Sequence, residues 1–222
     1  MKKLALITAI CALAAAPVSA DMMTVNIDFQ PLGGTLYSGL GMAPDSGTYW
    51  NPMSVGSSSN LLASDGTTVT DIDILTTYVR TYTNPWPNAL LRDRAIWSDG
   101  GNYPGTLSTP AITVSGLDAG ALYDIYLYAG YYPQTYVIDS ISKTLTGADY
   151  TLDQPNWTEG IQYVSFLGVS AANGSIGIDI YNTAPTDTVV SGMQIQAVPV
   201  PGAVLLGMLG LSVAGVKLRR RA

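Results

Sequence analysis

Residues 162–181, QYVSFLGVSAANGSIGIDIY, contain the pattern that decides the fold of this chain. Within residues 175–181, three isoleucines alternate with small or polar residues, which is the period of two expected of a β-strand with one buried face. Residues 162–169 predict a second strand. Between the two, Asn173-Gly174 is a tight-turn signal, because both residues tolerate a positive φ. The stretch predicts β structure interrupted by turns.

The same pattern extends through residues 21–197, where Gly, Pro, Asn and Asp recur roughly every 8 to 15 residues. Residues 135–139 and 142–146 are expected to form a hairpin. The one helical candidate is residues 88–97, where Leu90, Leu91 and Arg94 interrupt the β pattern, and a short helix or turn is expected there. Further strands are predicted at residues 24–30, 68–79, 111–115, 122–129 and 189–197.

Alternation along the predicted strands indicates which side chains share a face. In residues 24–30, three apolar residues alternate with Asn26 and Asp28, and residues 122–129 alternate in the same way. Eight or more antiparallel strands in one domain predict an all-β, two-sheet antiparallel sandwich. A jelly roll is favoured over an immunoglobulin-like fold, which usually has about 100 residues.

Composition excludes several classes of function. The 222 residues carry a net charge of −6, contain no histidine and one cysteine, and are 47% apolar. The apolar content is too high for a disordered chain. An acidic chain is a poor nucleic-acid partner, because binding needs a basic face. Without histidine there is no Ser-His-Asp or Cys-His catalysis and no His-ligated metal site.

The N-terminal 20 residues predict a secretory signal peptide. Lys2 and Lys3 precede a 13-residue apolar run at residues 4–16, which is too short to span a bilayer comfortably. Small residues then lead to a cleavage site expected after Ala20. The lone cysteine, Cys11, lies inside this segment, so the exported chain is expected to contain no disulfide.

The C-terminal segment, residues 198–222, predicts a membrane helix with a basic tail. Two prolines at Pro199 and Pro201 end the preceding structure, because each removes a backbone donor. Residues 202–216 follow without a charge, and a helix of that length is roughly 22 Å long. The basic residues after it are expected to stay on the cytoplasmic side. These residues are Lys217, Arg219, Arg220 and Arg221.

This order of features resembles the PEP-CTERM sorting signal of Gram-negative bacteria. Val198, Pro199 and Pro201 match the family motif, while Val200 stands where that motif usually has glutamate. The resemblance implies an exosortase, a membrane protease, as processing partner. It also implies a precursor anchored in the inner membrane and a final place at the cell surface or in the extracellular matrix. A simple single-pass anchor is the alternative, and the effect of Val200 on processing stays open.

A second resemblance lies in the exported domain, residues 21–197. Residues 28–29, 39–51, 123–128 and 191–195 are similar to landmarks of PEP-CTERM proteins with a galactose-binding-like jelly roll. That resemblance implies a place and a fold more than a reaction. We therefore expect a non-enzymatic surface or matrix protein associated with exopolysaccharide. A carbohydrate-binding module and, less favoured, a hydrolase that uses aspartates are the alternatives.

Tryptophans are the candidate carbohydrate-binding residues. Sugar sites place flat aromatic rings against pyranose rings, with polar oxygens around them. The alternative is that these rings pack in the core or at its rim. The candidates are Trp50, Trp86, Trp97 and Trp157, all expected in loops or at strand ends.

Two carboxylates mark a candidate calcium site. Asp71 and Asp73 lie on one face of a predicted strand, and calcium prefers several hard oxygen ligands. The alternative is the solvated face of a half-buried strand. No cofactor is expected beyond such a structural calcium ion. A catalytic carboxylate pair cannot be assigned, because Glu159 is the only glutamate and nothing nearby marks a partner.

The charge is unevenly distributed along the chain. The two end segments carry six of the ten basic residues, and all sixteen acids lie between them. The exported domain therefore has four basic residues against sixteen acids, a net charge of −12. Such a charge favours solubility and suits bridging by cations outside the cell.

Overall fold

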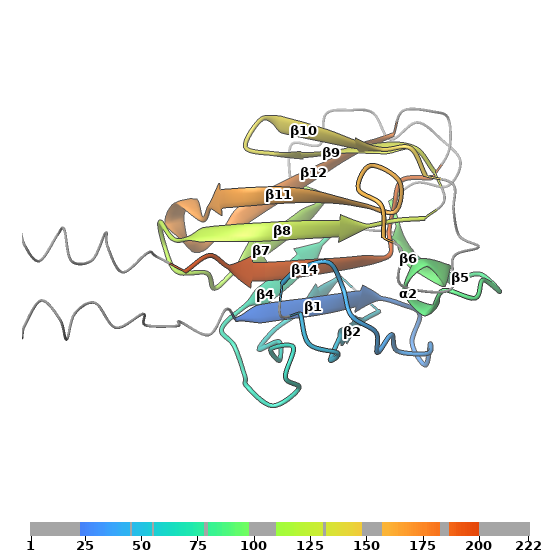
Figure 1. The fold of residues 1–222 in the computed structure, drawn as a ribbon, viewed down its shortest axis with the longest axis horizontal. Helices are drawn as coiled ribbons and strands as arrows, with labels where there is room; N and C mark the ends of the chain where they lie inside the picture. The colour runs from blue at the N-terminus through green and yellow to red at the C-terminus, as the bar shows by residue number, and fades with distance from the viewer. Residues whose placement is uncertain are drawn as a thin grey trace, which may run out of the picture. The chain divides into compact units, whose positions relative to one another are not determined.

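The computed structural model describes residues 23–44, 46–54, 56–77, 80–97, 110–130, 132–147, 157–182 and 187–199, and those up to Val198 belong to one compact unit. Within these residues the strands form three sheets, with very little helix (Figure 1). The predicted all-β sandwich class is confirmed. No helix in the described part is long and apolar enough to cross a bilayer. The segments predicted as signal peptide and membrane helix, residues 1–20 and 202–216, lie outside the described residues.

The five-stranded sheet joins the two ends of the domain. Its central strand β14 lies between β8 and β1 and is antiparallel to both. The order is β11-β8-β14-β1-β2, with β1 at Thr24–Phe29, β2 at Asn51–Met53, β8 at Leu122–Tyr128, β11 at Tyr163–Ser170 and β14 at Gly192–Ala197.

The other described strands form a six-stranded and a three-stranded sheet. The six-stranded order is β10-β9-β12-β7-β4-β3, with β3 at Ser57–Ser58, β4 at Asp73–Thr76, β7 at Ile112–Ser115, β9 at Gln134–Ile138, β10 at Ile141–Leu145 and β12 at Ile176–Asn182. The three-stranded order is β13-β6-β5, with β5 at Arg80–Thr83, β6 at Asp93–Ile96 and β13 at Val189–Val190.

The main core lies between the five-stranded and six-stranded sheets. Ile27 and Ile125 from the first sheet and Ile112 and Ile178 from the second belong to one cluster and are completely buried. Burying an isoleucine side chain stabilises a fold by about 1.5–3 kcal/mol. The predicted alternation in β1 and β8 is confirmed, because their apolar residues line this core. The isoleucines of β12 do the same.

The short helix or turn expected within residues 88–97 is confirmed, and Asp93–Ile96 of that range form a strand. The helix is one turn, α2 at Ala89–Arg92, where Asn88 Oδ1 accepts hydrogen bonds from the amides of Leu90 and Leu91. Asp93 then adopts an extended backbone, and β6 pairs with β5 and β13. Those backbone pairs and the burial of β6 outweigh the local helical preference.

Local turns were predicted better than the pairing of strands. The hairpin of β9 and β10 is confirmed, with Ile138 opposite Ile141. Asn173 and Gly174 both have a positive φ, as expected. However, β11 and β12, on either side of that turn, belong to different sheets rather than pairing with each other. The turn, which contains the 3₁₀ segment η1 at Ala172–Gly174, carries the chain from one layer to the other.

Three further expectations need correction. The sandwich is not wholly antiparallel, because β2 runs parallel to β1. The last predicted strand, residues 189–197, is divided at Ser191 into β13 and β14, which lie in different sheets. The strand predicted over residues 68–79 is shorter in the structure and consists of β4 alone. Ahead of β4, Val69 forms an isolated bridge with Leu62. The third, small sheet was not predicted.

Candidate functional site

Both faces of β1 are buried. Val25 and Ile27 face the main core, while Asn26 and Asp28 point to the opposite face of the sheet and are also completely buried. Asn26 Nδ2 donates to the carbonyl oxygens of Ser46 (2.7 Å) and Tyr49 (2.9 Å). The segment between β1 and β2 therefore covers the outer face of the five-stranded sheet.

Gln194 on β14 fixes the same segment from the neighbouring strand. Its Oε1 accepts hydrogen bonds from the amides of Met42 (2.8 Å) and Ala43 (3.0 Å) and from the hydroxyl of Tyr128. Its Nε2 donates to Asn26 Oδ1 at 2.7 Å. Buried polar groups cost little only when they are paired, so this network specifies one position for the covering segment.

Two buried carboxylates lie next to this network. Asp28 Oδ2 accepts from the amide of Tyr37 at 2.9 Å, and Asp93 Oδ1 accepts from the hydroxyl of Thr83 at 2.5 Å. The second oxygen of each carboxylate is buried without a hydrogen-bond partner. Burial raises the pKa of Asp28 to about 7, opposed by the Tyr37 amide and by Arg92 and increased by the charge of Asp93. Burial also raises the pKa of Asp93.

An open cavity of about 610 Å³ lies beside these carboxylates. Arg92 is the charged residue that lines it, with its side chain 23% exposed. The Arg92 Nε is buried without a hydrogen-bond acceptor, 4.0 Å from Asp93 Oδ2. The other lining residues are Pro31, Leu32, Gly33, Gly34, Thr35, Thr83, Asn84 and Pro85. Oxygen, amide and guanidinium groups can therefore meet a polar ligand here.

Arg94 on β6, in the three-stranded sheet, contacts two aromatic rings. The guanidinium of Arg94 lies 5.2 Å from the ring centre of Tyr82 and 5.3 Å from that of Trp86. Its Nη1 also donates to the side-chain oxygen of Asn84 at 2.7 Å, once that amide is oriented to satisfy its neighbours. The two rings are held in place by one cation.

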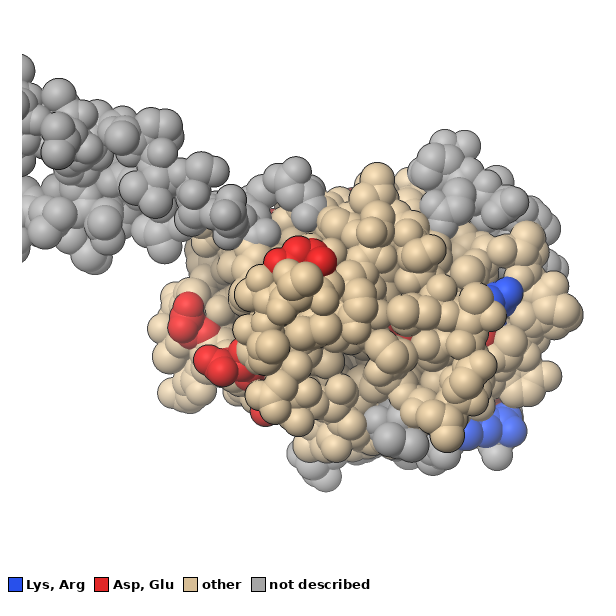
Figure 2. Space-filling view, turned by 90° about the horizontal axis from the view of Figure 1, so that it is seen from below, with Lys and Arg blue, Asp and Glu red and all other residues tan. Residues whose placement is uncertain are grey.

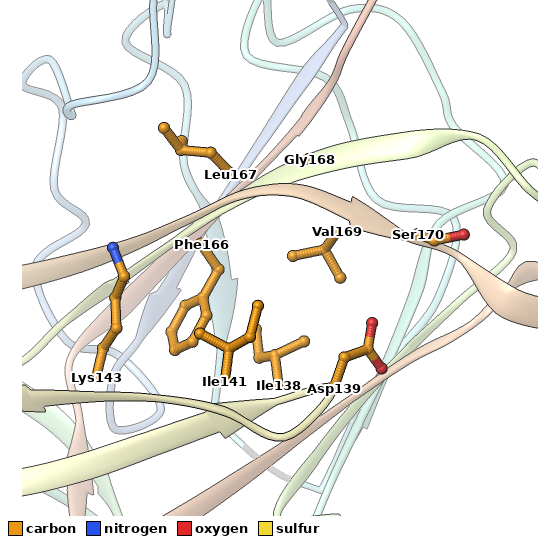
Figure 3. A pocket seen from close by; sticks show the side chains of 9 residues that line it. All are labelled: Ile138, Asp139, Ile141, Lys143, Phe166, Leu167, Gly168, Val169 and Ser170. Atoms are coloured by element: carbon orange, nitrogen blue, oxygen red, sulfur yellow. The ribbon is translucent and has the colours of Figure 1, made fainter.

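A second cavity, of about 450 Å³, opens between β10 and β11, the edge strands of the two large sheets (Figure 3). Figure 3 shows Phe166 and Val169 directed toward the β9–β10 hairpin, while Leu167 points away. The one cation in the lining, Lys143, pairs with Glu159 at 3.2 Å. The lining is mainly apolar, and we consider this groove a weaker candidate for polar ligands.

The four predicted tryptophans do not form one platform. Trp50 is completely buried, donates to the carbonyl of Gly39 at 2.9 Å and contacts Tyr128 edge-on. Trp157 is half-buried and packs on the same tyrosine at 5.1 Å. Trp97 lies in the main core. Trp86 directly follows Pro85, which lines the Arg92 cavity. A carbohydrate contact through Trp86 or Trp157 stays a prediction.

The predicted calcium ligands are not brought together with further acids. Asp71 is exposed, and Asp73 Oδ1 accepts from the amide of Asn60 at 3.0 Å. Among the described residues, no group of three or more His, Cys, Asp or Glu side chains is placed to hold a metal ion. A structural calcium ion stays a prediction.

The predicted sorting residues lie mostly beyond the described part. Val198 and Pro199 follow β14, and the Val198 amide donates to the carbonyl of Leu122 at 2.9 Å. Pro201, the basic tail at residues 217–221 and the cleavage residue Ala20 lie outside the described residues.

Arg92, Asp28 and Asp93 were not predicted as site residues. One signal was present in the sequence: residues 80–94, RTYTNPWPNALLRDR, contain three of the four basic residues of the domain together with Tyr82 and Trp86. The burial of Asp28 had no signal, because alternating polar residues normally face solvent.

Comparison with known proteins identifies no relative by sequence: no protein-family model and no curated protein matches this chain. Among solved structures, the chain is similar to the crystal structure of the Bacillus subtilis protein YxiM, with a TM-score of 0.44 and 11% identity. The match covers 79% of this chain and 40% of that protein, so this chain spans less than half of its length.

Proposed function

We propose that this chain is an exported, non-enzymatic protein of the cell surface or extracellular matrix of a Gram-negative bacterium. It is sorted by a C-terminal signal of the PEP-CTERM type, processed by an exosortase, and associates with exopolysaccharide. The observation that carries the proposal is the order of its end segments. A signal-peptide pattern comes first, and the Val198-Pro199-Val200-Pro201 motif, an uncharged run and a basic cluster come last.

The position of the motif relative to the fold supports this proposal. The last strand, β14, ends at Ala197, one residue before the motif begins. Proteolysis near Pro199 and Pro201 would therefore leave every described strand intact. Thr24 is also the register partner of Gln196, so both ends of the domain leave the same end of the five-stranded sheet (Figure 1).

The jelly-roll form of the sandwich belongs to the same proposal. It is supported by the crossing of the chain between layers at η1 and by the pairing of β1 with β14, 172 residues apart at Thr24 and Gln196. Greek-key connections of this kind bring sequence-distant strands side by side.

The test expresses the full chain in a Gram-negative host that has an exosortase. Replacing Pro199 and Pro201 together by alanine should leave an unprocessed chain in the inner-membrane fraction, with a higher mass than the mature protein. Pro52→Ala is the matched control, because Pro52 is an exposed proline away from the motif. Unchanged mature mass and location in the double variant would refute sorting by this motif.

The alternative of an aspartate hydrolase has less support. Asp28 and Asp93 lie near the Arg92 cavity, but both are completely buried, and neither lines its wall. Asp139 lines the second cavity as its one carboxylate. A hydrolase screen in which Asp28→Asn and Asp93→Asn abolish a measured activity would favour that alternative. Binding without turnover is the function that this geometry favours.

A further inference from the structure

We propose that the cavity beside Arg92 binds a carboxylate of an acidic polysaccharide, with Arg92 as its anchor. This inference rests on the proposed association with exopolysaccharide and names the class of polymer and the site. It gives a strongly acidic domain one place at which an acidic polymer is attracted rather than repelled.

The distribution of charge favours this end of the domain. Figure 2 shows most of the visible Asp and Glu side chains toward one end of this face and Lys and Arg at the other, where Figure 1 places β5 and α2. Arg80, Arg92 and Arg94 all belong to this region. Lys143, the fourth cation of the domain, is paired with Glu159 elsewhere. Attraction toward such a region raises the local concentration of an anionic ligand.

The setting of Arg92 suits recognition of a carboxylate. Its side chain is mostly enclosed, and its contact with Asp93 Oδ2 at 4.0 Å is too long for a hydrogen bond. A guanidinium presents donors in a fixed fork that matches the two oxygens of a carboxylate. Burial raises the pKa of Asp28 and of Asp93, which opposes the ionisation of both carboxyl groups near Arg92.

Groups that suit sugar hydroxyls surround this cation. Thr83, Asn84 and Thr35 line the cavity, and Thr35 is exposed. Trp86 and Tyr82, which contact Arg94, supply aromatic surface beside Asn84 and Pro85. Gly33 leaves open space, since a Cβ built on it meets no atom within 4 Å. A cavity of about 610 Å³ is large enough for a short stretch of polymer.

The test uses the full chain purified in detergent and polygalacturonate as the acidic probe, with neutral dextran for comparison. Retardation in affinity gels or calorimetry should show binding to polygalacturonate but not to dextran, weakening as salt is raised. Arg92→Gln should lower the affinity by about tenfold or more. Lys143→Gln, which removes the same charge at a distant position, should change it by less than about twofold.

A second pair of variants keeps the test valid if Arg92→Gln is misfolded, which circular dichroism would reveal. Thr35→Glu places a carboxylate at the exposed cavity wall and should abolish binding, while Thr35→Gln, of the same size, should preserve it. The proposal is overturned if polygalacturonate does not bind, if dextran binds equally, or if Lys143→Gln matches Arg92→Gln. It is also overturned if Thr35→Glu and Thr35→Gln behave alike.

These outcomes are separate from those of the proposed function. Sorting is measured in cells by the mass and location of the Pro199 and Pro201 variants, and polymer binding is measured on purified protein. Loss of sorting dependence with intact Arg92-dependent binding would refute the proposed function alone. Normal sorting without binding to polygalacturonate would refute this inference alone.

Discussion

Gln194 and Asn26 share a hydrogen bond of 2.7 Å across 168 residues of sequence, and both side chains are completely buried. The pair joins the last strand of the sandwich to the first. It also anchors the segment between β1 and β2, because each partner binds backbone groups of that segment. The contact is one part of the hydrogen-bond network that holds the covering segment on the five-stranded sheet.

Gln194→Leu should destabilise the fold by about 3 kcal/mol, because the buried partners of Gln194 would lose their hydrogen bonds. Urea unfolding measures the effect. Gln30→Leu is the matched control, since the buried Oε1 of Gln30 accepts no hydrogen bond, and its replacement should cost much less. Equal losses in both variants would show that the network does not anchor the segment.

Gly41→Ala should destabilise by about 1–3 kcal/mol, because a Cβ on Gly41 would overlap the side-chain amide of Gln194. The measurement is again the free energy of unfolding. Gly56→Ala serves as the control, since its added Cβ would lie 3.5 Å from the nearest atom, Thr76 O. A loss at Gly56 as large as that at Gly41 would indicate a backbone effect rather than this overlap.

Stability should fall as the pH rises from about 4 to about 7. The pKa of Asp28 is raised from 3.8 to about 7, mainly by burial, so the folded state binds a proton that the unfolded state has released. A rise of about three pKa units corresponds to about 4 kcal/mol of stability, present at low pH and lost by neutral pH. The raised pKa of Asp93 acts in the same direction.

Asp28→Asn should remove most of this pH dependence, as measured by urea midpoints at pH 5 and pH 8. Asp65→Asn should leave it unchanged, because hydrogen bonds from Thr68 and Thr67 lower the pKa of Asp65 and keep it ionised over that range. If the urea midpoint of Asp28→Asn still changes as much between pH 5 and pH 8, another group causes the pH dependence of stability.

Trp50→Ala should destabilise by about 3–5 kcal/mol, because it empties a completely buried site and removes the hydrogen bond to Gly39. Trp86→Ala should cost less, since Trp86 is only half-buried, and should weaken retention on polygalacturonate. Thermal unfolding and affinity gels measure the two effects. A Trp50 variant that stays as stable as the native chain would contradict this assignment of the ring to the core.

Sequence patterns predicted the strands that alternate clearly. The periodicity of apolar residues was sufficient to predict β1, β8 and β12, because in a strand with one face on the core every second side chain is buried. The short helix or turn expected within residues 88–97 is present as α2, but the pattern did not predict the strand β6 that follows it. That strand depends on pairing with β5 and with β13, which lies more than 90 residues further along the chain.

Less of the candidate site than of the fold could be predicted from the sequence. Trp86 was among the predicted residues, but Trp50 and Trp97 have the same side chain and lie in the protein interior. Arg92 becomes notable only when the structure places it beside Asp93 and residues 31–35. Residue type alone does not tell a ring in the core from one at a cavity.

The sequence by itself determined the β class, the turn at Asn173 and Gly174, and the apolar faces of the main strands, because these follow from local periodicity and backbone preference. Tertiary structure decided which strands are neighbours and that both faces of β1 are buried. It alone assembled Arg92, Asp93 and Asp28 beside one cavity. Those features depend on contacts between distant segments, whose energies exist only when the whole chain is folded.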